Sequence, residues 1–158
     1  MTDALAGGCA CGRVRYRLAS QPMFVNCCHC LDCQRQTGSA FVINAIIEAD
    51  RVVLEGAGPK AFPVPTDSGR PHVIWRCEGC ATAVWSTYGG RTQTRFVRAG
   101  TLDDPTAVTP DAHIFTRSKQ PWVELPAEQP AFAIFYDLET QWPPESLERR
   151  RVALAAPA

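Results

Sequence analysis

Apolar and polar residues alternate over short stretches along most of this chain. Residues 14–18 alternate in this way, and residues 41–47 and 52–54 are rich in β-branched side chains. Alternation and β-branching are both typical of β-strands. The same criteria predict further strands at 24–28, 73–76, 83–86, 95–99, 113–116 and 133–136. The pattern therefore predicts a chain built mainly from short strands.

Turn-forming residues separate these stretches and leave little room for helices. Glycine, proline, aspartate and serine gather at 56–60, 67–71 and 103–111, which are expected to be turns or loops. The chain has 13 prolines, and proline disrupts helix interiors. One helical turn is predicted at 31–37, ended by Gly38. We therefore expect an all-β fold with short twisted antiparallel sheets and little helix.

The length of 158 residues suits one domain. We place a zinc-binding domain at residues 1–138 and treat residues 139–158 as a C-terminal tail that is either helical or disordered. No apolar run is long enough for a membrane helix, and residues 1–8 lack the features of a secretory signal. Basic and acidic residues balance at 16 each, which disfavours nucleic-acid binding. These features predict a cytoplasmic protein without a membrane or nucleic-acid partner.

Eight cysteines fall into three groups along the sequence. In a chain expected in a reducing compartment, clustered cysteines favour metal binding over disulfides. The pairs Cys9/Cys11 and Cys77/Cys80 supply four sulfurs, enough for a closed tetrahedral zinc site. The second pair is typical of a metal-binding knuckle, in which Gly79 is expected to permit the tight turn.

The middle group contains Cys28, Cys30 and Cys33 in a CxCxxC run. Three protein ligands with one open position are typical of catalytic zinc. The sequence thus predicts two Zn²⁺ ions per chain, one structural and one catalytic. Iron is the main competitor for such thiolates. The spacing is also compatible with a second structural ion that has an unidentified fourth ligand, and with buried thiols or disulfides without metal.

Four sequence motifs form a recognisable set: GGCACG at 7–12, CHCLDCQRQTGSAF at 28–41, CEGC at 77–80 and HIFTRSKQPW at 113–122. Together they resemble the motifs of the glutathione-dependent formaldehyde-activating enzyme and centromere protein V family. The resemblance covers roughly residues 5–135.

This resemblance implies a β-tent fold built around zinc. It assigns a structural zinc and a second zinc near the substrate to two separate ligand sets, Cys9, Cys11, Cys77 and Cys80 for the first and Cys28, Cys30 and Cys33 for the second. The founding activity of the family joins formaldehyde and glutathione into S-hydroxymethylglutathione, and its members are classed as carbon–sulfur lyases. Cys27 and the C-terminal tail depart from the family pattern.

Basic residues near these motifs are candidates for binding the carboxylates of a glutathione-like ligand. They are Arg35, Arg117 and Lys119, each of which could equally be a solvated surface charge. His113 is a candidate proton shuttle in the substrate site or a hydrogen-bonded structural histidine. His29 lies between two predicted ligands and is either a ligand itself or directed away from the metal.

Several neighbouring side chains in these regions are expected to be structural. Cys27 precedes Cys28 along a predicted strand, so it should lie on the opposite face as a buried free thiol. Trp75, Trp85 and Trp122 are predicted to belong to the core.

The function predicted from these features is a zinc-dependent enzyme that acts on a thiol–aldehyde adduct, with glutathione and a small aldehyde as partners. Three thiolates make zinc a weaker Lewis acid than three histidines do, so positioning of a substrate thiolate is favoured over activation of water. Two competing hypotheses are a non-catalytic zinc-stabilised module that binds a protein, and a thiol redox protein. Association with chromatin is disfavoured because the only basic run is 149–151.

Overall fold

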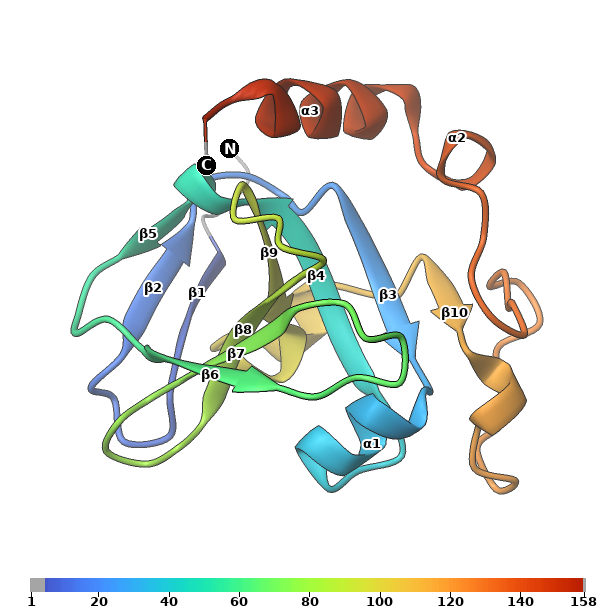
Figure 1. The fold of residues 1–158 in the computed structure, drawn as a ribbon, viewed down its shortest axis with the longest axis horizontal. Coiled ribbons are helices and arrows are strands. Elements are labelled where there is room, and N and C mark those ends of the chain that lie inside the picture. Colours follow the sequence, from blue (N-terminus) through green and yellow to red (C-terminus); the bar gives the residue numbers. More distant parts are fainter. Residues whose placement is uncertain (1–4, 158) are drawn as a thin grey trace.

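Strands dominate the computed structural model, which describes residues 5–157 (Figure 1). The strands are β1 (Leu5–Gly8), β2 (Arg15–Leu18), β3 (Phe24–Cys28), β4 (Val42–Glu48), β5 (Val52–Leu54), β6 (Lys60–Val64), β7 (His72–Arg76), β8 (Ala83–Tyr88), β9 (Thr94–Arg98) and β10 (Ala112–Ile114). The α-helices are α1 (Leu31–Thr37), α2 (Leu138–Gln141) and α3 (Pro144–Ala155). Within this part of the chain, the expected all-β class is confirmed.

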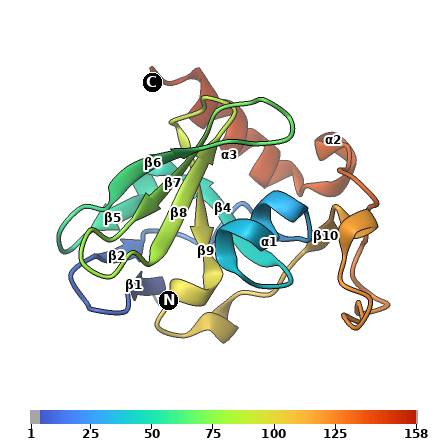
Figure 2. The same ribbon diagram turned by 60° about the horizontal axis from the view of Figure 1, so that its bottom comes forward.

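The strands form two sheets. The smaller sheet has the order β1-β2-β5, and the larger has the order β10-β3-β4-β9-β8-β7-β6. Neighbouring strands are antiparallel, except that β10 pairs with β3 in the parallel direction. The small sheet lies beside the β6–β8 side of the large sheet (Figure 2). The expectation of antiparallel sheets therefore holds at every strand pair but one.

The two faces of the central strands bury two different clusters. Ala45 and Ile47 of β4 pack with Tyr16 and Trp85 in a core between the sheets. Alternate residues of β4 point to the other face, where Ile46 joins a cluster that contains the three residues Phe24, Tyr136 and Trp142. Because side chains alternate across a strand, a single apolar strand supplies both cores.

Local sequence signals account for helix α1 and for most strands. Helix α1 has the predicted bounds and ends at Gly38, whose φ of 62° lies in the left-handed region that favours glycine. The strand predicted at 133–136 is wrong, because backbone carbonyls there accept hydrogen bonds from the turn after β10 instead of from a strand. Strand β6 was not predicted; it contains Pro63 and lies at the sheet edge, where a missing N–H is tolerated.

The C-terminal segment is helical and packs on the strands. Helix α3 lies across β4 and β9 (Figure 1). The buried hydroxyl of Ser146 donates to the carbonyl of Met23 at 2.6 Å. The Arg149 guanidinium donates to both carboxylate oxygens of Glu48, at 2.8 and 2.7 Å. Among the described residues, no helix is both long and apolar enough to cross a membrane.

We expect Arg149→Met to lower the free energy of unfolding by about 2 kcal/mol at neutral pH. The substitution leaves the Glu48 carboxylate, whose side chain is 7% exposed, with the more distant Arg51 as its ion-pair partner. Burial raises the pKa of Glu48, but the charge and hydrogen bonds of Arg149 outweigh burial and hold that pKa below its ordinary value. A depressed carboxyl pKa contributes stability above the unfolded-state pKa of about 4.3 and loses it as pH falls further.

Chemical denaturation between pH 7 and pH 3 measures this effect. The wild-type protein should lose more stability than Arg149→Met as pH falls below about 5. The matched control is Arg151→Met, since Arg151 pairs with Glu148 on the exposed side of the same helix and its loss should change little. Parallel pH profiles for the wild type and Arg149→Met would contradict the assignment.

Candidate metal centres

Four cysteine sulfurs converge where the β1–β2 turn meets the β7–β8 turn. The Sγ atoms of Cys9 and Cys11 are 3.5 Å apart, and those of Cys11 and Cys77 are 3.7 Å apart. Cys80 completes the group, in which all four sulfurs lie within 4.8 Å of one another. Tetrahedral zinc with Zn–S bonds near 2.3 Å separates its sulfurs by about 3.8 Å. The group therefore has the ligand type, number and spacing that such an ion requires.

Two backbone turns bring these sulfurs together. Gly12, with a φ of 78°, donates its N–H to the carbonyl of Cys9 at 3.1 Å. In the second turn the left-handed residue is Ala81, with a φ of 61°, and its N–H donates to the carbonyl of Cys77. The expectation that Gly79 permits this turn is therefore wrong, because the strained position falls just after the CxxC pair.

Hydrogen bonds to sulfur favour the thiolate form of Cys80 and Cys9 in this group. The hydroxyl of Thr82 lies 3.2 Å from the Cys80 Sγ. This contact is the largest of several hydrogen bonds that lower the pKa of Cys80 to about 5. The backbone N–H of Val14 donates to the Cys9 Sγ at 3.2 Å. Thiolate is the form that binds a metal ion, so these donors favour binding.

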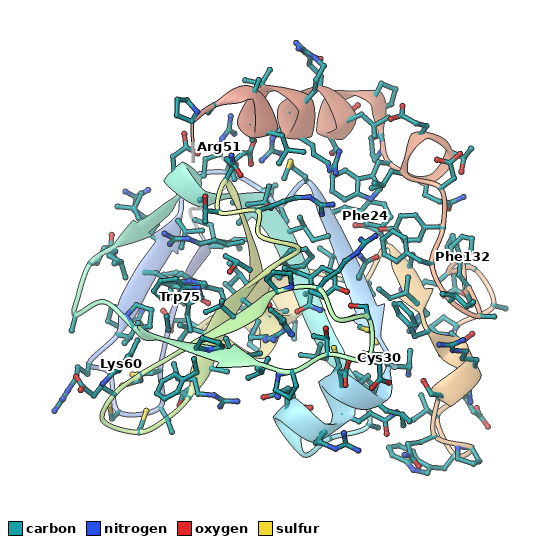
Figure 3. The ribbon with its side chains drawn as sticks, viewed as in Figure 1. Phe24, Cys30, Arg51, Lys60, Trp75 and Phe132 are labelled. Atoms are coloured by element: carbon teal, nitrogen blue, oxygen red, sulfur yellow. The ribbon has the colours of Figure 1, made fainter. Side chains whose placement is uncertain are left out.

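Three further cysteines gather where β3 leads into α1. Cys28 ends β3, Cys30 is the N-cap of α1, and Cys33 lies in its first turn. Their Sγ atoms all lie within 4.8 Å of one another, and Cys30 marks the position in Figure 3. Hydrogen bonds from the Cys28 and Cys33 thiols lower the pKa of Cys30, and the same contact with Cys30 raises the pKa of Cys28. These contacts therefore favour the thiolate form at Cys30 over that at Cys28.

Two structural facts bear on how these cysteines are used. All eight are free, so a disulfide framework does not describe this structure. Within residues 5–157, no fourth Cys, His, Asp or Glu ligand atom lies within 4.8 Å of all three sulfurs of the Cys28/Cys30/Cys33 group. The triplet can therefore hold a metal ion with a position left for another ligand.

A third group consists of Cys27, His29 and His113, all of them buried. His113 Nε2 lies 2.7 Å from Gln129 Oε1 and therefore donates to it, which leaves His113 Nδ1 to accept from His29 Nε2 at 3.0 Å. Burial, and then the charges of His113 and Lys119, lower the pKa of His29 to about 4. His29 is therefore neutral at pH 7. It does not belong to the triplet, and its hydrogen bond is made to His113 and not to a cysteine of the triplet.

The expectation that Cys27 is a buried free thiol is confirmed. Cys27 is 2% exposed and free, as predicted for the strand face opposite Cys28. Burial raises the pKa of its thiol to about 12, and a neutral buried thiol is a poor nucleophile.

The predicted carboxylate-binding residues are scattered over the surface. Arg35 and Arg117 are exposed, and within residues 5–157 neither has an acidic partner within 4.0 Å. Lys119 donates to the backbone carbonyls of Gln120 and Val123, at 3.1 and 2.6 Å. Nothing in these contacts directs their charges to the triplet.

The tryptophans differ in burial. Trp85 is buried between the sheets and Trp75 packs against that core. The prediction that Trp122 belongs to the core is wrong: it is 72% exposed and lines a shallow cavity with Phe41 and Gln120. A tryptophan that follows Pro121 in a turn has no strand neighbours to cover it.

Sequence reasoning missed the polar residues inside the large sheet. Arg98 of β9 is paired in register with Asn44 of β4, and its guanidinium donates to the Asn44 side chain. Burial, and then the charge of Arg98, lower the pKa of His72 on β7. A signal was present, since Arg98 and Asn44 interrupt apolar strand patterns, and a polar residue on a buried strand face requires a partner.

These observations define a cysteine-rich all-β protein with groups of side chains that can hold metal ions. The family profile described as "Glutathione-dependent formaldehyde-activating enzyme" matches residues 4–118, and the chain belongs to this family. A curated relative from Halomonas elongata, named "Putative glutathione-dependent formaldehyde-activating enzyme", is 29% identical over 133 residues, which cover 79% of this chain and 83% of the relative. A crystal structure of a Rhodobacter sphaeroides protein is similar over 67% of this chain and 92% of that protein, with 16% identity and a TM-score of 0.49.

Metal content per chain tests the partition of the cysteines. After loading with Zn²⁺ and gel filtration, the wild-type protein should retain two ions, and Cys30→Ala should retain one with its fold intact. The double variant Cys77→Ser/Cys80→Ser should lose the other ion together with much of its thermal stability, because metal binding at a closed site is linked to folding.

The control for metal content is Cys27→Ser, which removes a thiol outside both groups and should retain two ions. Elemental analysis and thermal melting measure the two properties. Retention of both ions by Cys30→Ala, or loss of an ion by Cys27→Ser, would overturn the partition.

Proposed function

We propose that this protein is a zinc-dependent enzyme of the carbon–sulfur lyase type that forms or cleaves a thiol–aldehyde adduct, with glutathione and formaldehyde as substrates. Family membership and the name of the relative support the substrate class. The observation that carries the proposal is the triplet Cys28, Cys30 and Cys33, which converges without a fourth protein ligand among residues 5–157.

The two cysteine groups suit two different roles. Cys9, Cys11, Cys77 and Cys80 supply a complete set of four sulfurs and would hold a structural zinc. The triplet would hold a second zinc, which when bound lowers the pKa of a substrate thiol and keeps it deprotonated near neutral pH. Cys28 is buried, whereas Cys30 and Cys33 are partly exposed, so the triplet is reached from the side of α1.

The reaction is an addition without net oxidation. In the forward direction a sulfur lone pair forms the carbon–sulfur bond, the carbonyl π pair moves to oxygen, and that oxygen takes up a proton. The thiol has released one proton, so protons balance. The chain's task is to hold a thiolate sulfur near the carbonyl carbon, which raises the effective concentration of the two reactants.

The fold gives the triplet a rigid support. Cys33 donates its backbone N–H to the Cys30 Sγ at 3.3 Å. The Gln34 side chain joins α1 to the next layer by donating to the carbonyls of His29 and Ser118, at 2.9 and 2.8 Å. These bonds tie the start of α1 to the residue after β3 and to the turn after β10, which restrains the spacing of the sulfurs.

A redox role for Cys27 is disfavoured by its burial and raised pKa. We place the protein in the cytoplasm, because eight free cysteines favour a reducing compartment.

Exchange of formaldehyde between its hydrate and S-hydroxymethylglutathione tests the proposal, because it can be followed at equilibrium by magnetisation-transfer NMR. The zinc-loaded wild-type protein should raise the exchange rate above the spontaneous rate, and Cys30→Ala should abolish at least about 99% of that increase. Circular dichroism checks that the variant keeps its fold.

Cys27→Ser is the matched control, since it removes a neighbouring thiol outside the triplet and should keep the rate within about twofold of wild type. Exchange at the spontaneous rate in the presence of wild-type protein, for glutathione and for a panel of further thiols and aldehydes, would rule out the proposed reaction.

A further inference from the structure

A cavity of about 440 Å³ lies between α1, the start of β4 and the β7–β8 turn. We call it the arginine cavity, because two arginines, Arg76 and Arg98, line it together with Gln36, Thr37 and Phe41. Cys80 of the four-cysteine group lies at one side. On the other side the Thr37 hydroxyl donates to the backbone carbonyl of Cys33 at 2.8 Å. The cavity therefore separates the two cysteine groups.

Arg98 is buried without an acidic partner. It is 6% exposed, and within residues 5–157 it has no carboxylate within 4.0 Å. Its guanidinium donates to the neutral Asn44 side chain, and its Nε has no hydrogen-bond partner among the described residues. Burying a guanidinium is unfavourable unless an anion compensates it. The cavity wall thus carries a positive charge with no carboxylate partner, and among the described residues the only anionic groups that act on it are the cysteines of the triplet.

Arg76 adds a second positive charge to the same cavity. Its guanidinium donates to the backbone carbonyl of Ala81 at 3.1 Å, and to the backbone and side-chain oxygens of Gln36, each at 3.4 Å. All of these acceptors are neutral. Two arginines that share a cavity repel each other, and an anion placed between them removes the repulsion.

Strand register places Arg98 on the sheet face that carries the triplet. Cys28 is paired with Val42 on β4, and Asn44, two residues along β4, is paired with Arg98 on β9. Directly paired residues and residues two apart share a face, so Cys28 and Arg98 point to the same side of the sheet. An anion in the arginine cavity would therefore lie on the side of the sheet that carries the triplet.

We propose that the arginine cavity binds a carboxylate of the thiol substrate through Arg98 and Arg76, while the sulfur of that substrate reaches the Cys28/Cys30/Cys33 group. The inference rests on the proposed function and assigns two residues that would recognise a carboxylate of its thiol substrate. The guanidinium fork matches a carboxylate in shape and charge. The exposed Arg35 and Arg117 do not line this cavity, and Lys119 already donates to backbone oxygens.

Binding of S-methylglutathione tests the proposal, because this ligand keeps both carboxylates of glutathione and lacks a free thiol. Calorimetry on the zinc-loaded full chain should show that S-methylglutathione binds at least about tenfold more tightly than its dimethyl ester. Arg76→Gln and Arg98→Gln should each weaken binding of the acid at least about tenfold, and should leave binding of the ester nearly unchanged.

The control is Arg70→Gln, which removes the same charge from an exposed site outside the cavity and should preserve the preference for the acid. If Arg98→Gln fails to fold, the partly exposed Arg76 still provides the test. A role of Arg98 confined to balancing the triplet would change metal affinity and leave the preference for the acid intact.

Three results would overturn the proposal: no binding of S-methylglutathione, equal binding of the acid and the ester, or an unchanged preference in an arginine variant that folds. Because S-methylglutathione cannot react, its binding reports on the cavity even if the protein fails to accelerate formaldehyde exchange. Failure of the proposed reaction and failure of the arginine cavity are therefore distinguishable.

Discussion

The convergence of four sulfurs at the meeting point of two turns is the constraint on which the rest of this structure depends. Cys9 and Cys11 follow a strand of the small sheet, and Cys77 and Cys80 follow a strand of the large one. The two pairs are 66 residues apart between Cys11 and Cys77, and closing so long a loop costs conformational entropy. Four thiolates in contact also repel each other. A bound cation would offset both costs and would couple the joining of the two sheets to metal binding.

With the sheets joined, the alternation of side chains along β3 places a buried structural cysteine and a candidate metal ligand on opposite faces of the sheet. Neighbouring cysteines on this strand point to opposite faces. Cys27 lies on the face that also carries the hydrogen-bonded histidine pair, and Cys28 points to the face where α1 delivers Cys30 and Cys33. The aromatic cluster that supports this second face includes Phe24, and Figure 3 shows Phe24 and Phe132 on the side toward the C-terminal segment. The helix α3 closes the same side through Ser146 and Arg149. The C-terminal segment is therefore part of the support for the face that carries the triplet.

The buried charges also lie on the face of the sheet that carries the triplet. The sequence is neutral overall, yet the interior holds a cation, Arg98, near three cysteines, of which Cys30 favours the thiolate form. A buried charge is tolerated where an opposite charge or a ligand compensates it, so the arginine cavity and the triplet are best understood as one electrostatic unit.

Local sequence patterns determined most of the strands, helix α1 and the cysteine groups, because alternation, capping and ligand spacing act between near neighbours in sequence. The bounds of α1, the left-handed Gly38 and the buried Cys27 all follow from such short-range rules. Short-range rules failed where tertiary contacts decided the outcome: at 133–136, whose carbonyls serve another turn, at Trp122, which no neighbour covers, and at Ala81, which takes the strained position in place of Gly79.

Only the tertiary structure placed Arg98 opposite Asn44, joined His29 to His113, and brought Arg76 and Arg98 to one cavity. These pairs are separated by many residues, and their meeting depends on strand order and register, which no local pattern encodes. The sequence by itself thus determined which atoms can bind a metal ion, and the packing of the two sheets decided which charges surround it. The physical reason is that ligand spacing is set by a few backbone torsions, whereas a buried charge acquires its neighbours from strands far apart along the chain.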